Sequence, residues 1–287
     1  MKSADLTSMS SDSSACRPLT VTRSIAEYPI ANRPLAHHRQ ELLDGAGLHA
    51  HPHAWLDPRE FAAFLTSGAG VLLDADGTAL AWRGDPPDSV RSITAGKSFL
   101  IRHPWDFLRA NEQYGADLAG NIIEGNIHPS AVIEGVIHLG AGSRILPGVF
   151  VEGNVVIGAN CKIGPNCYLR GSTSIGDDCH IGQAVEIKNC LILSHTNVGH
   201  LSYVGDSVLG EHVNFGAGTI TANFRHDNQT HRSAVNGVLI DTGRLKLGAI
   251  VGDGVHTGIH TSIYPGRKLW PNTSTRPGEI VQRDIEA

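Results

Sequence analysis

The sequence predicts a mainly β fold, in which a coil of short parallel strands is preceded by a small α/β N-terminal domain. From Ile127 onward every sixth residue is aliphatic, and the position four residues later is small or β-branched. The residues before about 120 lack this repeat. A helix spaces its apolar face at three and four residues and an isolated strand at two. A strict period of six therefore indicates a short strand plus a corner, repeated as the sides of a triangular coil.

The repeat defines two sets of inward positions. The aliphatic set is Ile127, Ile133, Leu139, Ile145, Val151, Ile157, Ile163, Leu169, Ile175, Ile181, Ile187 and Leu193. The corner set is Ala131, Ser143, Val149, Val155, Cys161, Cys167, Thr173, Cys179 and Val185. After Leu193 the spacing shortens to five twice, through Val198 and Leu209.

This pattern resembles the hexapeptide repeat of the left-handed parallel β-helix, an exception to the right-handed crossover preference. It gives Cys161, Cys167 and Cys179 a structural role as packed inward side chains rather than a catalytic one. The chain has five cysteines and no CxxC pair, which argues against a disulfide framework and against a zinc ribbon.

The organisation predicted along the chain is a disordered lead over 1–15, a truncated α/β domain over 16–120 and the coil over 121–280. Three helices are predicted before the coil, at 33–47, at 57–68 with Asp57 as N-cap, and at 103–113. Residues 71–82 are typical of a hairpin about the Asp76–Gly77 pair.

Composition excludes several classes of partner. The net charge is −5 over 287 residues, with no Lys/Arg-rich block, so neither nucleic acid nor an anionic membrane is an expected partner. The Ser-rich start lacks the apolar core of a secretory signal, and no later apolar run is long enough to span a bilayer. A cytoplasmic protein is therefore expected.

Two cations are predicted to stack on the coil. Arg170 and Lys188 are eighteen residues apart, which is one full coil of three hexads, so they are expected to be separated by about 4.8 Å. Stacked cations repel unless an anion lies between them, which indicates a phosphate or carboxylate pocket. The alternative left open is a pair of solvated residues neutralised by Glu186 or another acidic neighbour.

A histidine and a tyrosine follow these cations. His200 lies twelve residues after Lys188, and Tyr203 follows three residues later. Histidine is the usual general base near neutral pH. Judged by itself, a single histidine is more often structural than catalytic.

The run from Arg170 to Phe224 resembles the acetyltransferase domain of the bifunctional glucosamine-1-phosphate acetyltransferase/N-acetylglucosamine-1-phosphate uridyltransferase family. The matching strings are "YLRGSTSIG", "VEIKN", "GHLSYVGD" and "VNFGAGTITANF", and the intervals between them also match. The resemblance implies that Arg170, Lys188 and Tyr203 hold the phosphate of an amine acceptor and that His200 takes a proton from its amine.

The same resemblance assigns further residues. Glu186 and Asn223 join His200 in the catalytic set, and Asn214 helps Asn223 to orient the acceptor. The backbone around Gly216 and Ala217 would face the acetyl-CoA thioester. Ile259 stands where a coenzyme A-contacting serine is expected, and Phe224 stands where a tyrosine is usual, so the details of coenzyme A binding are expected to differ.

The implied chemistry is direct acyl transfer. The free amine would attack the thioester carbonyl, and a backbone N–H would stabilise the oxyanion by roughly 3–4 kcal/mol. No metal and no covalent enzyme intermediate are required. In the family that it resembles, the site forms between neighbouring coils of a homotrimer.

The N-terminal region carries a second resemblance. The string "RPLTVTRSIAEYPIANRPLAHHRQELLDGAGL" resembles the opening of sugar-1-phosphate nucleotidyltransferases, but the Gly-rich phosphate loop position reads "SDSSAC". The region is also about half the length that such a domain needs to build its nucleotide crevice. We therefore expect no nucleotidyl transfer, and a remnant that serves as a packing or oligomerisation module or as a cap shaping acceptor access.

Three functional hypotheses follow. The first is an acetyl-CoA-dependent N-acetyltransferase acting on an amino-sugar phosphate resembling glucosamine 1-phosphate. The second keeps the chemistry and replaces the acceptor with another small, carboxylate-bearing amine. The third is a catalytically silent trimeric scaffold, in which changing His200 would alter no activity.

Overall fold

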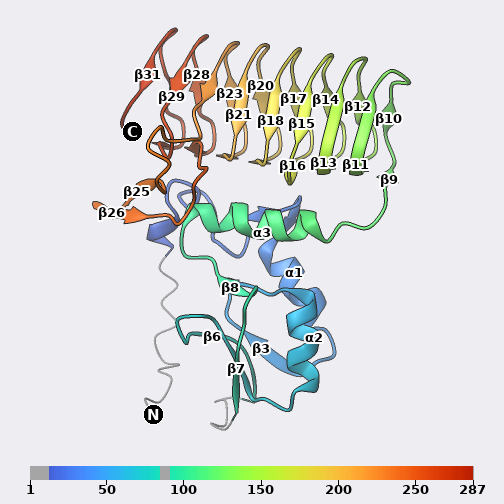
Figure 1. Cartoon of the computed structure of the whole chain (residues 1–287), viewed down its shortest axis with the longest axis vertical. Coiled ribbons are helices and arrows are strands. Elements are labelled where there is room, and N and C mark those ends of the chain that lie inside the picture. The colour runs from blue at the N-terminus through green and yellow to red at the C-terminus, as the bar shows by residue number, and fades with distance from the viewer. Residues whose placement is uncertain (1–12, 85–90, 287) are drawn as a thin grey trace.

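The computed structural model describes residues 13–84 and 91–286. A long coil of stacked strands forms one side of the molecule, and the N-terminal region lies along it, with a helix running beside the coil (Figure 1). Residues 1–12 of the predicted disordered lead lie outside the described residues. Ser14–Cys16, which overlap the end of that lead, form a short 3-10 helix (η1).

The N-terminal region contains the three predicted helices, α1 (Leu35–Leu43), α2 (Pro58–Thr66) and α3 (Pro104–Ala116). The Asp57 side chain caps α2 as predicted, because its Oδ1 accepts the backbone N–H groups of Arg59 and Glu60 at 3.1 and 2.9 Å. The predicted hairpin is also present.

The strands of this region are short. They are β1 (Pro29–Ile30), β2 (Arg33–Pro34), β3 (Leu48–Ala50), β4 (Ala54–Trp55), β5 (Val71–Leu73), β6 (Ala79–Arg83), β7 (Ser92–Thr94) and β8 (Phe99–Leu100). Strands β3, β6, β5 and β7 form a four-stranded sheet in that order, while β1 pairs with β2 and β4 with β8.

The coil is a left-handed parallel β-helix with three faces. The first face is β10 (Asn126–Ile127), β12 (Arg144–Ile145), β14 (Lys162–Ile163), β17 (His180–Ile181), β20 (Asn197–Val198), β23 (Asn214–Phe215) and β28 (His256–Thr257). The second face is β15 (Tyr168–Arg170), β18 (Glu186–Lys188), β21 (Tyr203–Gly205), β24 (Ile220–Thr221), β29 (Ser262–Ile263) and β31 (Ile280–Val281). The third face is β16 (Thr173–Ile175), β19 (Leu191–Ile192), β22 (Val208–Leu209), β27 (Ile250–Val251) and β30 (Lys268–Leu269).

Three further strands and one insertion complete the coil. Strands β9 (Ile122–Ile123), β11 (Val132–Leu139) and β13 (Phe150–Ile157) begin the second and third faces, and β13 pairs with both β15 and β16. Between β24 and β27 the chain leaves the coil as an antiparallel hairpin, β25 (Arg232–Val235) and β26 (Val238–Asp241).

The strand register corrects one detail of the predicted repeat. Early turns contain eighteen residues, as in the pairing of Ile163 with Ile181, but Ile175 pairs with Ile192, seventeen residues later. The first of the two predicted shortenings therefore falls between Ile187 and Ile192, so its placement between Leu193 and Val198 was wrong. The second, which ends at Leu209, is confirmed, because Ile187 pairs with Val204 and Ile192 pairs with Leu209. The corner after β18 has one residue fewer than the corner after β15. The sequence hides this because aliphatic residues occupy both 192 and 193.

Among the residues described, two of the three packed apolar clusters form the coil interior and join the N-terminal region to the coil. The inward positions of the coil form one cluster, which includes Cys161, Cys167 and Cys179 at 1%, 1% and 2% exposure, so their predicted structural role is confirmed. A second cluster joins α3 to the third face: it contains Trp105, Phe107, Leu108, Leu191, Leu193, Val208 and Ile250. The N-terminal region is therefore held against the coil by a shared apolar core.

Candidate active site

The two predicted cations stack in register on the second face, where Arg170 of β15 pairs with Lys188 of β18. Each has its own carboxylate. Arg170 Nη2 lies 2.6 Å from Glu186 Oε1, and Lys188 Nζ lies 2.8 Å from Asp206 Oδ2. The neutralisation that the sequence left open is thus present for both cations, with Glu186 as one partner and the unanticipated Asp206 as the other.

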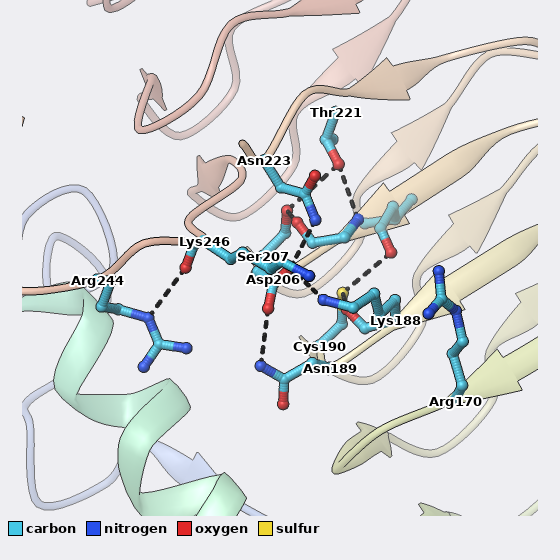
Figure 2. A network of polar contacts seen from close by, with 12 residues as sticks. Arg170, Lys188, Asn189, Cys190, Asp206, Ser207, Thr221, Asn223, Arg244 and Lys246 are labelled. Carbon is cyan, nitrogen blue, oxygen red and sulfur yellow. Dashed lines mark hydrogen bonds and ion pairs between the residues drawn. The ribbon is translucent and has the colours of Figure 1, made fainter. Parts of the chain in front are cut away.

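Asp206 is the centre of a polar network at the corner after β21 (Figure 2). Its side chain is 4% exposed, and its Oδ2 accepts hydrogen bonds from Lys188 Nζ at 2.8 Å and from Asn223 Nδ2 at 2.6 Å. Its Oδ1 accepts a third from Asn189 Nδ2 at 3.0 Å. With these three donors the buried charge is well satisfied. We call Lys188, Asn189, Asp206 and Asn223 the Asp206 network.

Sequence reasoning did not select Asp206 as a site residue, although a signal was present. Asp206 lies eighteen residues after Lys188, the same interval that singled out Arg170 and Lys188. Its φ of 49° is in the left-handed region, where Asp and Asn are better tolerated than most residues. Because an acidic residue suits such a corner conformationally, its type alone did not mark Asp206 as a site residue.

Tyr203 lies along the second face and reaches the Asp206 network. Its hydroxyl accepts a hydrogen bond from Asn223 Nδ2 at 3.0 Å. Gly205 leaves room for it, because a Cβ there would lie 2.4 Å from Tyr203 Oη and 2.6 Å from Asn223 Nδ2. Burial, together with the nearby charge of Asp206, raises the pKa of the Tyr203 phenol. The hydroxyl therefore keeps its proton at neutral pH and can donate it to an anion.

The insertion after β24 positions Asn223 through its backbone. His231 is buried, and its Nε2 lies 3.0 Å from the Asn223 carbonyl oxygen. Burial lowers the pKa of His231, which favours a neutral ring that donates from Nε2 to this carbonyl. The backbone N–H of Leu247 donates to the same oxygen at 3.0 Å.

The predicted base lies at a different corner, in the turn between β20 and β21. The Gly218 N–H donates to the His200 carbonyl at 2.8 Å, and the His260 N–H donates to the Ala217 carbonyl at 2.8 Å. These bonds place Ala217 one turn beyond His200, and Ile259 one turn beyond Ala217. We call His200, Ala217 and Ile259 the His200 ridge, and Gly216 immediately precedes its middle residue.

The His200 ridge carries exposed side chains and a backbone N–H that makes no hydrogen bond among the described residues. The His200 side chain is exposed, and within the described residues it makes no hydrogen bond or ion pair. The backbone N–H of Ala217 has no acceptor within the same part of the chain. Ile259 is 51% exposed.

The structure therefore brings some predicted residues together and leaves others apart. Arg170, Glu186, Lys188, Tyr203 and Asn223 lie on or beside the second face, whereas Asn214 lies on the first face, where it pairs with Asn197 and His256. Between the His200 ridge and the Asp206 network no side-chain hydrogen bond is found among the residues described. Tyr203 is the connection, since it follows His200 by three residues and its hydroxyl bonds to Asn223.

Metal-binding clusters and membrane-spanning helices are both absent from residues 13–84 and 91–286. In these segments no group of three or more His, Cys, Asp and Glu side chains is arranged to hold a metal ion. The helices of the same segments include none that is both long and apolar enough to cross a membrane.

The fold fits a left-handed β-helix acyltransferase that resembles the acetyltransferase domain of a bifunctional sugar-phosphate enzyme. Residues 151–272 match the family model described as the GMPPB C-terminal domain. The chain is 41% identical over 187 residues to the "Bifunctional protein GlmU" of Methanocaldococcus jannaschii, covering 65% of this chain and 45% of that protein. It is 51% identical over 186 residues to the protein of the same name from Methanococcus maripaludis strain C7, again covering 65% and 45%.

A third relative has a more explicit name. The "Bifunctional sugar-1-phosphate nucleotidylyltransferase/acetyltransferase" of Sulfurisphaera tokodaii is 47% identical over 102 residues, 36% of this chain and 25% of that protein. This chain thus spans less than half the length of the curated relatives that it matches. Among solved structures, the GDP-perosamine N-acetyl transferase of Caulobacter crescentus (H141A mutant) overlaps with a TM-score of 0.24 at 20% identity, covering 54% of this chain and 51% of that one, which is too slight to carry an argument.

Proposed function

We propose that this protein is an acetyl-CoA-dependent N-acetyltransferase that acts on an amino-sugar phosphate, with glucosamine 1-phosphate as the acceptor. The observation that carries the proposal is the register of the His200 ridge. An exposed histidine lies one turn of the coil from a backbone N–H without an acceptor, that of Ala217, within the described chain. A proton acceptor and an oxyanion donor side by side are what acyl transfer to an amine needs.

The second face supports a phosphate-bearing acceptor. Arg170 uses Nε and Nη2 for Glu186, and Lys188 uses one of its three N–H groups for Asp206, so both cations keep further donors for an anion. The neutral Tyr203 hydroxyl adds another donor beside them. A phosphate on this face would share the two cations with their carboxylates rather than meet an unpaired positive patch.

The acyl donor fits the His200 ridge. Gly216, Ala217 and Gly218 have no side chain beyond a methyl group, so a thioester can approach the backbone closely. In the proposed reaction His200 takes a proton from the acceptor's ammonium, and the free amine attacks the thioester carbonyl. The Ala217 N–H donates to the oxyanion of the adduct, whose nitrogen loses its second proton to solvent. Collapse of the adduct then forms the amide and expels the coenzyme A thiolate, which takes a proton from the protonated His200.

A homotrimer is part of the proposal. On one chain the ridge and the Asp206 network lie apart, so a neighbouring coil is proposed to complete the site. Nucleotidyl transfer is not part of the proposal, because the N-terminal region lacks the glycine-rich phosphate loop in its sequence.

The test is coenzyme A release by purified protein given acetyl-CoA and glucosamine 1-phosphate. The His200→Asn variant removes the base, and His212→Asn is its control, because His212 is an exposed histidine of the same coil that stacks on His195 at another corner. Release that is lost in His200→Asn and kept in His212→Asn supports the proposal.

Two other outcomes decide between the alternatives. Release with carboxylate-bearing amines, but not with glucosamine 1-phosphate, would move the acceptor assignment to the second hypothesis. Equal silence of wild type and both variants with every amine would favour the scaffold.

A further inference from the structure

The N-terminal region reaches the proposed acceptor site through one side chain. Glu112 of α3 accepts a hydrogen bond from Asn189 Nδ2 at 2.7 Å, and it accepts the guanidinium of Arg244 at 2.5 Å on Oε1 and 3.3 Å on Oε2. Its carboxylate therefore connects α3 with the corner after β18 and with the part of the insertion that follows β26. Resting on the proposed function, we propose that Glu112 is a positioning residue for the acceptor site.

The first route to the site runs through Asn189. The amide nitrogen of Asn189 has two N–H groups, and the structure uses both, one toward Glu112 and the other toward Asp206 Oδ1 at 3.0 Å. Rotation of the amide would break one of these bonds. Glu112 thus fixes the donor that holds one oxygen of the carboxylate facing Lys188.

The second route runs through the insertion. The carbonyl of Arg244 accepts the backbone N–H of His231 at 2.9 Å, and the His231 ring bonds to the Asn223 carbonyl. Asn223 in turn donates to Asp206 Oδ2. By holding the Arg244 guanidinium on α3, Glu112 therefore also restrains the segment that places the second amide donor of Asp206.

The helix that carries Glu112 is held on the coil. Its neighbour Asn111 donates from Nδ2 to the Ser172 carbonyl at 2.8 Å and accepts from Ser174 Oγ at 2.5 Å. The apolar residues of α3 pack against the third face in the shared cluster. The position of the carboxylate is thus set by the N-terminal region, which gives this region a role in acceptor binding rather than in packing alone.

The variant Glu112→Gln keeps the shape and removes the charge. A neutral amide has one acceptor oxygen, so it cannot accept hydrogen bonds from the Asn189 amide and from both guanidinium nitrogens of Arg244. The positions of Asn189 and Arg244 are then less well fixed. We expect the KM for glucosamine 1-phosphate to rise about three- to tenfold with kcat within about twofold, because binding geometry and not the reacting groups is disturbed. Arg244→Gln should give the same change, and the double variant should add little to either single one.

Asp117→Asn is the matched control. Asp117 lies at the end of the same helix and pairs with Arg59 at 3.0 Å, away from the acceptor site. It should leave the KM unchanged. The inference would be overturned if Glu112→Gln and Asp117→Asn had the same KM. It would also be overturned if both variants lost activity in proportion to a fall in their melting temperatures.

A binding measurement separates this inference from the proposed reaction. Inorganic phosphate should raise the melting temperature of the wild type and of Asp117→Asn, and this shift should shrink in Glu112→Gln. If the shift behaves so while no amine is acetylated, the positioning role stands and the proposed function falls. If acetylation occurs and Glu112→Gln changes neither KM nor the shift, only the positioning role falls. A wild type that neither turns over nor responds to phosphate would overturn both.

Discussion

Lys188 and Asp206 form an almost buried ion pair, with Nζ 2.8 Å from Oδ2 and side-chain exposures of 15% and 4%. A buried carboxylate with three donors is costly to alter, because its partners lose a charged acceptor and cannot turn to water. Asp206 is therefore a structural centre of the site as well as the counterion of Lys188, one of the two cations proposed to hold the phosphate.

The variant Asp206→Asn tests this. It keeps the shape and tolerates the left-handed φ, but it leaves Lys188 without a counterion. We expect the free energy of unfolding to fall by about 2–4 kcal/mol, read from the denaturant midpoint at constant slope. In the control Asp227→Asn, the exposed pair with Arg225 is lost and the midpoint should not move. An equal shift of the denaturant midpoint in the two variants would show that the buried Asp206 network stabilises the fold no more than an exposed ion pair does.

Gly205→Ala should uncouple Tyr203 from Asn223. The added Cβ would lie 2.4 Å from Tyr203 Oη and 2.6 Å from Asn223 Nδ2, so both side chains must move. Because Asn223 Nδ2 also donates to the buried Asp206, the free energy of unfolding should fall by about 1–2 kcal/mol, while coenzyme A release by the folded protein falls about tenfold or more.

Two further variants control this prediction. Tyr203→Phe removes the hydroxyl that bonds to Asn223, so Gly205→Ala should lower coenzyme A release little further once Tyr203→Phe is present. Gly96→Ala introduces a Cβ that meets Glu60 Oε1 at 3.3 Å, far from the site, and should leave release unchanged. Full activity in Gly205→Ala would mean that the Tyr203–Asn223 contact is not needed.

The coil could be predicted because its repeat is local. One strand and one corner recur every six residues, so the spacing alone stacked Arg170 on Lys188. The shortened corner before Ile192 could not be placed, since Leu193 next to it is equally aliphatic and is buried against the N-terminal region instead. Glu112 could not be found either, because its partners Asn189 and Arg244 are 77 and 132 residues away and meet it only when α3 packs on the coil.

The pH dependence of stability should include a contribution from His51. Burial, with nearby His53, Arg102 and Arg39, lowers the pKa of His51 from 6.5 to about 4. Its Nδ1 accepts the backbone N–H of His53 at 3.0 Å, which requires that nitrogen to be unprotonated. As the pH falls below 6.5, His51 binds a proton in the unfolded chain but not yet in the folded chain. The contribution of His51 to the free energy of unfolding is therefore fully present above pH 6.5 and is lost as the pH falls toward 4.

The measurement is the denaturant midpoint at pH 7.5 and at pH 5. His51→Asn keeps an acceptor for the His53 N–H but cannot be protonated, so the midpoint should decline less between the two pH values than in wild type. The exposed His37→Asn is the control and should decline as wild type does. An unchanged decline in His51→Asn would exclude this histidine as a source of acid sensitivity.

The five cysteines should be inert until the chain unfolds. All are buried and free, and burial raises the pKa of Cys167 to about 11 and of Cys190 to about 12. Since the thiolate is the reactive form, Ellman's reagent at pH 8 should react with none of them in the native protein and with all five in guanidinium. Ser130→Cys provides an exposed thiol on the same coil that should react at once. Fast reaction of Cys167 in the native protein would instead show that the interior of the coil opens to solvent without global unfolding.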